Sequence, residues 1–203
     1  KAEEVRSAKD LLNPKWHGKI STDDPMISGT GAANAAMLYR QLGAEYVKRL
    51  YIDQNRSFSG ERRQYTDCLA RGTYPTCLNC RADDVAPLRK EGFKLVEVFE
   101  LADLRPQVNG SPWLLTVANK APHPNAARVF ANWIASKEGL EAYSRGYGSV
   151  TLRTDVDESF LERATIPRDG VKYFEETEWN WAVSGRAEAR DKVVDQLAGH
   201  AFT

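Results

Sequence analysis

The sequence lacks an excess of charge of either sign: Lys and Arg number 28, Asp and Glu number 28, and the formal net charge is zero. Proteins whose main partner is a nucleic acid or an anionic membrane carry a strong positive charge, so neither is expected here. The sequence also lacks an apolar run of the ~20 residues that a membrane-spanning helix requires. Its 203 residues are 42% apolar, which is enough for one or two soluble domains with a real core.

Residues typical of catalysis and metal binding are also scarce. The three histidines, His17, His123 and His200, are far apart in the sequence, and no serine-hydrolase elbow, zinc-protease motif or calcium loop is present. Asp23 and Asp24 are adjacent, as are Asp83 and Asp84, and adjacent side chains on a strand point apart. We interpret them as strand-end and helix-cap residues. The sequence therefore predicts no enzymatic activity, no metal and no cofactor.

Cysteine occurs only at Cys68, Cys77 and Cys80. The C-x-x-C spacing of the last two is found in zinc and redox sites, but zinc would need a further ligand and no histidine is nearby. A redox C-x-x-C usually opens a helix, whereas this one follows a predicted strand. In an oxidising compartment, one disulfide and one free thiol is the simplest arrangement. A Cys68–Cys77 bond would tie a helix to a strand, and the sequence leaves the pairing open.

The most informative stretch is residues 7–42. Ser7 is a good N-cap for a short helical turn over residues 8–12, which Pro14 ends. Residues 19–23 fit a short strand. A helix over residues 32–42 follows, and Gly43 ends it.

Between this strand and helix stands a glycine-rich loop, Ser28-Gly29-Thr30-Gly31. Such a loop leaves backbone N–H groups free at the positive end of a helix, where they attract an anion or a polar ligand group. It is not a dinucleotide-binding fingerprint, because a third glycine is missing. It is not a P-loop either, because no Gly-Lys-Ser/Thr follows.

Hydrophobic periodicity and turn residues predict the remaining elements. Residues 55–60 are expected to form a loop, and Ala126, Val129, Phe130, Trp133 and Ile134 form one apolar stripe of a helix that starts at Pro124 or Asn125. Strands are expected over 74–78, 94–100 and 113–118, and further helices over 44–55, 61–71, 138–144 and 185–197. Asp83 and Asp84 are expected to cap another helix, which ends at Glu91.

Two stretches carry a resemblance to a known family. The first reads DLLNPKWHGKI, followed by DDP and the glycine-rich loop, and the second reads APHPNAARVFANWIASKEGLEAYSR. They are similar to the solute-binding proteins of bacterial ABC importers, in the branch that includes ferric-iron binders. Together the two stretches and their surroundings cover well over half of the chain.

The resemblance implies an α/β fold of the type II periplasmic-binding-protein class. Residues 1–108 would form most of the second lobe, 109–148 would contribute to the first lobe, and 149–203 would return to the second. It also implies a periplasmic protein whose signal peptide and N-terminal part lie outside this sequence. We expect that part, or another chain, to cover Val129, Phe130, Trp133 and Ile134.

The function that the resemblance implies is capture of a solute between two lobes and its delivery to an ABC permease. An effector-binding domain of the same fold in a regulator is the alternative. The expected ligand-binding residues are Ser28, Gly29, Thr30, Gly31, Arg56, Ser57 and Tyr74. Their hydroxyl, N–H and guanidinium groups suit a carboxylate, phosphate or other oxyanion. The adjacent tyrosines of ferric-iron binders are absent, so we expect an anionic solute rather than iron.

Overall fold

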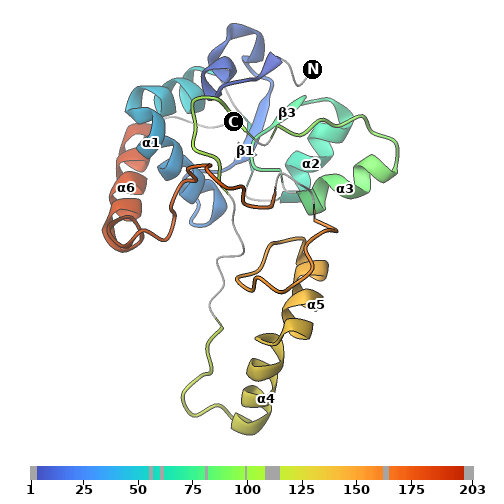
Figure 1. Cartoon of the computed structure of the whole chain (residues 1–203). Helices are drawn as coiled ribbons and strands as arrows, with labels where there is room; N and C mark the ends of the chain where they lie inside the picture. Colours follow the sequence, from blue (N-terminus) through green and yellow to red (C-terminus); the bar gives the residue numbers. More distant parts are fainter. Residues whose placement is uncertain are drawn as a thin grey trace. The chain divides into compact units, whose positions relative to one another are not determined.

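A computed structural model describes residues 4–54, 57–59, 62–80, 82–98, 100–107, 115–161 and 165–198. The chain forms two compact units (Figure 1). Unit 1 comprises Lys1–Pro106 and Glu175–Thr203, and unit 2 comprises Gln107–Phe174. None of the described helices is both long and apolar enough to cross a membrane.

A three-stranded parallel sheet is the centre of unit 1. Strand β1 (Ile20–Asp23) lies between β2 (Ser57–Ser59) and β3 (Thr76–Cys77). Every residue of β1 is buried, as expected for a central strand of a parallel sheet. Since all three strands run in the same direction, their carboxyl ends meet at one edge of the sheet. The α/β class predicted from the sequence is confirmed for this unit.

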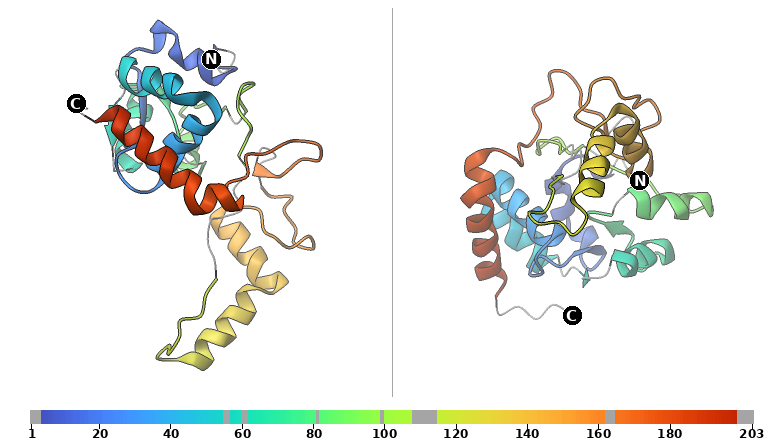
Figure 2. Two further views of the ribbon diagram at one scale, coloured as in Figure 1. Left: turned by 90° about the vertical axis from the view of Figure 1, so that its left-hand side faces the viewer. Right: turned by 90° about the horizontal axis from the view of Figure 1, so that it is seen from below.

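Helix α1 (Thr30–Lys48) follows β1 and continues into the π-helical turn η4 (Arg49–Asp53). Gly43, at φ 84°, interrupts the helical backbone, which confirms the predicted break between two helices. Helix α6 (Arg186–Leu197) follows the π-helical turn η6 (Trp181–Gly185) and lies along α1 in both Figure 1 and Figure 2. It buries its predicted apolar face, with Ala189, Val193 and Leu197 as the buried residues.

The core of unit 1 joins α1, α6, η4 and the N-terminal 3-10 helix η2 (Ala8–Leu12). Ser7 caps η2 as predicted, in a capping box with Asp10. The backbone N–H groups of Arg6 and Ser7 donate to the Asp10 carboxylate, and these hydrogen bonds hold the pKa of Asp10 below its usual range. The 3-10 helix η3 (Pro14–Trp16) then leads into β1. Helices α2 (Arg62–Arg71) and α3 (Ala82–Lys90) complete the unit.

Unit 2 contains two helices, α4 (Pro124–Ile134) and α5 (Lys137–Tyr147). Both were predicted, as was the cap of α5: the Ser136 hydroxyl accepts a hydrogen bond from the Gly139 N–H at 3.1 Å. The apolar stripe of α4 is largely open within the single chain. Val129 is 70% exposed, Phe130 56% and Trp133 42%, whereas Ile134 is half-buried. What covers this stripe stays a prediction.

Several predicted elements are wrong. The expected loop at 55–60 contains strand β2, because pairing with β1 prevails over the turn-forming character of its serines. The expected strand at 94–100 is irregular over 94–98 and at 100. Residues 115–118 are also irregular, and the start of that expected strand lies outside the described residues. Neither segment pairs with a described strand, and a strand without a ladder partner is not stable.

One helix boundary also differs from expectation. Helix α3 begins at Ala82, so Asp83 and Asp84 lie within its first turn and do not precede it. Residues 149–174 cluster with unit 2, and the boundary between the units lies near residue 107. The assignment of the units to lobes remains a prediction.

Candidate functional site

The connection between β1 and α1 is built as a tight turn followed by a close approach of two backbones. The Asp24 carboxylate accepts a hydrogen bond from the Met26 N–H at 2.8 Å, and the Ile27 N–H donates to the Asp24 carbonyl at 3.3 Å. Gly31, buried in the first turn of α1, then packs directly on the end of β1. A Cβ atom added to Gly31 would overlap the Asp24 carbonyl group and lie 3.0 Å from the Cβ of Asp23. Glycine is therefore required here to seat the helix on the strand.

The N-terminus of α1 carries no cap. Gly29 occupies the N-cap position at φ 135°, a backbone conformation that favours glycine, and it has no side chain to accept the first helical N–H groups. Among the described residues, none accepts a hydrogen bond from the N–H of Thr30 or Gly31. Both Ser28 and Thr30 are exposed. This end of α1 therefore presents free N–H donors, hydroxyl groups and the positive end of the helix dipole.

The strand order places this helix end at the point where parallel α/β sheets bind ligands. From β1 the chain passes to β2 on one side, and from β2 it crosses to β3 on the other side of β1. The strand order is therefore β2-β1-β3. Ligands of such sheets bind outside the carboxyl ends of the strands, where the strand order reverses. In this chain that point lies between the segment after β1, residues 24–31, and the segment after β3, residues 78–80.

The structure brings together only part of the predicted ligand-binding set. Ser28, Gly29, Thr30 and Gly31 lie together after the carboxyl end of β1. Tyr74 is half-buried and lies before β3, whose first residue pairs with Ile20 at the start of β1. The strand register thus places Tyr74 toward the opposite end of the sheet from the glycine-rich loop.

The structure describes only part of the other two predicted residues. Arg56 lies outside the described residues. The backbone of Ser57 begins β2 and pairs with Ser21, and its side chain also lies outside the described part of the chain. Their contact with a ligand stays a prediction.

The segment after β3 was missed as a part of this site. Leu78 donates its N–H to the Ser21 carbonyl at 2.9 Å, which ties this segment to β1. Asn79 adopts a left-handed backbone at φ 66°, and its side-chain Nδ2 is buried without a hydrogen-bond partner. The sequence signal for this turn is the C-x-x-C spacing, which is compatible with a zinc site, a redox pair or a disulfide and does not by itself indicate a ligand-binding turn.

Cys77 and Cys80 form a disulfide across this turn, and Cys68 is free. The sequence had left this pairing open. The bond closes a very short loop, since the two cysteines are only three residues apart. Loop entropy then gives a stabilisation of about 2 kcal/mol at most.

We expect the double variant Cys77→Ser/Cys80→Ser to melt a few degrees below the oxidised wild type, because about 2 kcal/mol of chain-entropy stabilisation is lost. A reductant should lower the melting temperature of the wild type and leave that of the double variant unchanged. Cys68→Ser serves as the control and should respond to reductant as the wild type does. An equal effect of reductant on all three proteins would contradict a stabilising Cys77–Cys80 bond.

The described residues hold no group of three or more His, Cys, Asp and Glu side chains that could bind a metal ion. Asp23 ends β1 with only 8% of its surface exposed and has an interaction partner in the structure. Its Cβ lies close to the first turn of α1. The arrangement as a whole can hydrogen-bond a polar solute through several donors and few acceptors.

Comparison with known proteins gives one match. A family model described as bacterial extracellular solute-binding protein matches residues 1–169, which is most of the chain. No curated protein and no solved structure matches it. The matched range includes β1, the glycine-rich loop, α1 and both helices of unit 2.

Proposed function

The chain belongs to the family of bacterial extracellular solute-binding proteins, and we propose that it captures a small solute for an ABC importer and delivers it to the membrane permease. Membership of this family places its work outside the cytoplasm, in the periplasm. The observation that carries the proposal is the family match over residues 1–169.

The solute site that we propose is the carboxyl edge of the sheet in unit 1. The uncapped start of α1 supports it, because Ser28, Thr30 and the backbone N–H groups of Gly29 and Gly31 offer several donors there. These donors and the helix dipole together stabilise an anionic group by ~0.3–1 kcal/mol, and by more in a partly buried site. Arg56 and Ser57 are retained in the proposal on the resemblance alone.

The solute that suits this edge carries an oxyanion. Free N–H and hydroxyl donors favour a carboxylate or phosphate oxygen. A hydroxylated carboxylate presents several oxygen acceptors to these donors. Ferric iron is not proposed, because the sequence has no adjacent tyrosine pair.

A thermal-shift screen with gluconate, lactate, tartrate, citrate, phosphate and ferric citrate tests the class of solute. We expect the hydroxylated carboxylates to raise the melting temperature most, since any ligand that binds only the folded state stabilises it. A shift with ferric citrate alone would overturn the oxyanion assignment. If none of the six compounds raises the melting temperature, the proposed site does not bind anions.

Thr30→Pro is the sharpest probe of the helix end. Proline is tolerated at the first position of a helix, where its missing N–H removes one free donor without breaking an intrahelical bond. A charge-assisted hydrogen bond contributes ~1.5–3 kcal/mol, so the affinity for the best anion of the screen should fall by about tenfold or more. Isothermal titration calorimetry measures this loss.

Two variants complete this experiment. Thr30→Ala keeps the N–H and loses only the hydroxyl, so its affinity should fall less than that of Thr30→Pro. Arg56→Ala should weaken binding by about tenfold to a hundredfold if its guanidinium contacts the solute. Equal affinities for wild type and Thr30→Pro would remove the start of α1 from the site, and an unchanged Arg56→Ala would remove Arg56.

A further inference from the structure

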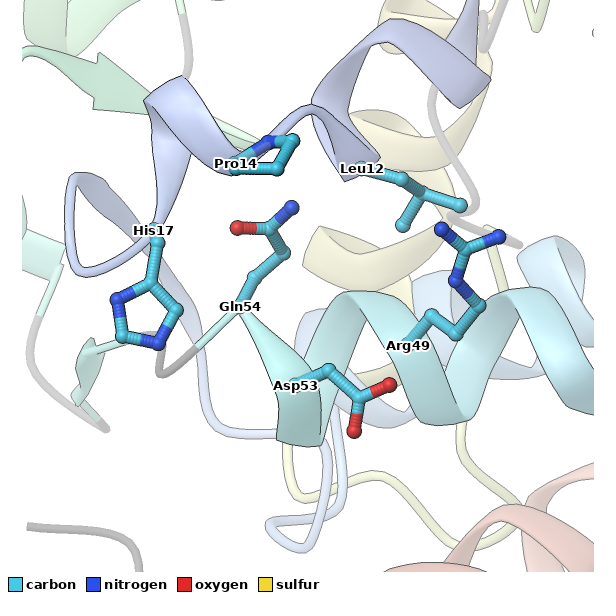
Figure 3. Close-up of a pocket in the computed structure, with 6 residues that line it drawn as sticks. All are labelled: Leu12, Pro14, His17, Arg49, Asp53 and Gln54. Carbon is cyan, nitrogen blue, oxygen red and sulfur yellow. The ribbon is translucent and has the colours of Figure 1, made fainter.

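Unit 1 has a hollow at the start of β1, the end opposite the glycine-rich loop. It is a half-open pocket of about 410 Å³ (Figure 3). Residues from η2 to the turn before β1 form one wall and the end of η4 forms the other, and the Gly18 N–H donates to the Gln54 carbonyl at 2.8 Å between them. Because β1 separates this pocket from the glycine-rich loop, it is not part of the proposed solute site. The lining residues are Leu12, Pro14, His17, Arg49, Asp53 and Gln54.

The pocket offers charges of both signs that do not neutralise each other. Arg49 and Asp53 are four residues apart, a spacing that pairs opposite charges on an α-helix. They lie in the π-helical turn η4, whose wider turn no longer places residues four apart directly above one another on one face of the helix. Figure 3 shows the guanidinium and the carboxylate pointing away from each other. Within the described part of the chain, neither side chain forms an ion pair.

The buried side chain of Gln54 is the second notable feature of this pocket. It is only 5% exposed, and its Nε2 donates to the Asn13 carbonyl at 3.2 Å, which fixes the orientation of the carboxamide. The Oε1 atom is buried and has no hydrogen-bond partner. A buried acceptor without a donor is unfavourable, and a bound group with an N–H would relieve it. The atom is closed to solvent, so a ligand N–H reaches it only if the wall of the pocket rearranges.

We propose that this pocket binds a free α-amino acid with an apolar side chain. Its carboxylate would pair with the Arg49 guanidinium, which suits bidentate binding of that group. Its ammonium would pair with the Asp53 carboxylate, since Figure 3 shows the Gln54 Oε1 on the far side of its carboxamide, toward His17. Leu12 and Pro14 form the apolar part of the lining and would contact the side chain. The proposal does not depend on which solute the other site binds.

L-leucine and two analogues that each lack one charged group test the proposal on the full chain. Isovalerate keeps the carboxylate and isoamylamine keeps the ammonium, on the same apolar body. We expect saturable chemical-shift changes in ¹H–¹⁵N spectra with L-leucine, centred on residues 12–18 and 49–54. Each analogue should bind at least about tenfold more weakly, because one of the two charge contacts is lost.

Substitutions of exposed charged residues test the proposal without disturbing the buried core. Arg49→Met and Asp53→Asn should each weaken L-leucine binding by about tenfold or more, while Lys48→Met, an exposed cation that does not line the pocket, should leave it unchanged. The proposal is overturned if L-leucine gives no saturable change, if the changes centre on residues 24–31, or if isovalerate binds as tightly as L-leucine. Changes at residues 24–31 would instead assign leucine to the proposed solute site.

Discussion

Gly139→Ala should lower the melting temperature by about 4–8 °C, whereas Gly146→Ala in the same helix should leave it unchanged or raise it slightly. Both glycines lie in α5, and neither needs a positive φ. A Cβ at Gly139 would overlap the Trp133 carbonyl and lie 2.7 Å from the Cα of Ile134. A Cβ at Gly146 would have no atom within 4 Å. The two substitutions therefore differ only in what the added methyl group meets.

The sizes of two opposing free-energy changes decide whether each substitution stabilises or destabilises the protein. Replacing glycine by alanine inside a helix gains ~0.5–1 kcal/mol, because the unfolded chain loses conformational freedom. Overpacking costs ~1–3 kcal/mol, and we expect the upper end at Gly139, since backbone atoms of α4 must move. The net loss at Gly139 is then about 2 kcal/mol, and the difference between the two variants is about 3 kcal/mol. Scanning calorimetry measures both, and equal melting temperatures would show that α4 and α5 do not pack as described.

The sequence predicted the helices best, because their ends depend on neighbouring residues. Ser7 and Ser136 cap the helices that they were expected to cap, and Gly43 breaks the backbone where a helix was expected to end. Capping and glycine breaks act within a few residues of the chain, so they are visible in the sequence.

The strands were predicted poorly for the opposite reason. Strand β2 has the composition of a turn, and only its pairing with β1 makes it a strand. Residues 94–98 alternate as a strand would, yet Arg89 holds this segment through a hydrogen bond to the Leu95 carbonyl and an ion pair with Glu97. Pairing partners lie far away in the sequence, so local pattern cannot show which segments will find one.

In the candidate site, too, features set by neighbouring residues were predictable and features set by strand pairing were not. The glycine-rich loop was recognised from its local pattern and lies at the carboxyl end of β1 as a strand–loop–helix unit should. The sequence predicts a strand that begins at Tyr74 and leads to the same edge, which is why Tyr74 is expected in the site. The register shows that this strand starts near Tyr74 and ends at Cys77, so the Asn79 turn, not Tyr74, reaches that edge. Strand direction and register are properties of the assembled sheet.

Gly31→Ala should have the largest effect in unit 1: a loss of about 3 kcal/mol of unfolding free energy, together with loss of anion binding. The added Cβ would overlap the Asp24 carbonyl group, whose carbon it would approach to 2.7 Å. Asp24 cannot retreat easily, because it follows the buried central strand, which is bonded on both sides to β2 and β3. The first turn of α1 must therefore move away from the sheet, and its free N–H groups move with it.

Amide hydrogen exchange separates this local effect from general destabilisation. In Gly31→Ala, the amides of β1 and the first turns of α1 should lose protection, while those of α5 in unit 2 keep theirs, because cooperative units open separately when their stabilities differ. Gly146→Ala is the matched control and should change neither set. Anion affinity should fall in Gly31→Ala even well below its melting temperature, since the donors are displaced in the folded state. Wild-type protection and affinity in this variant would mean that α1 is not seated on the end of β1, and the proposed solute site would then lose its geometric basis.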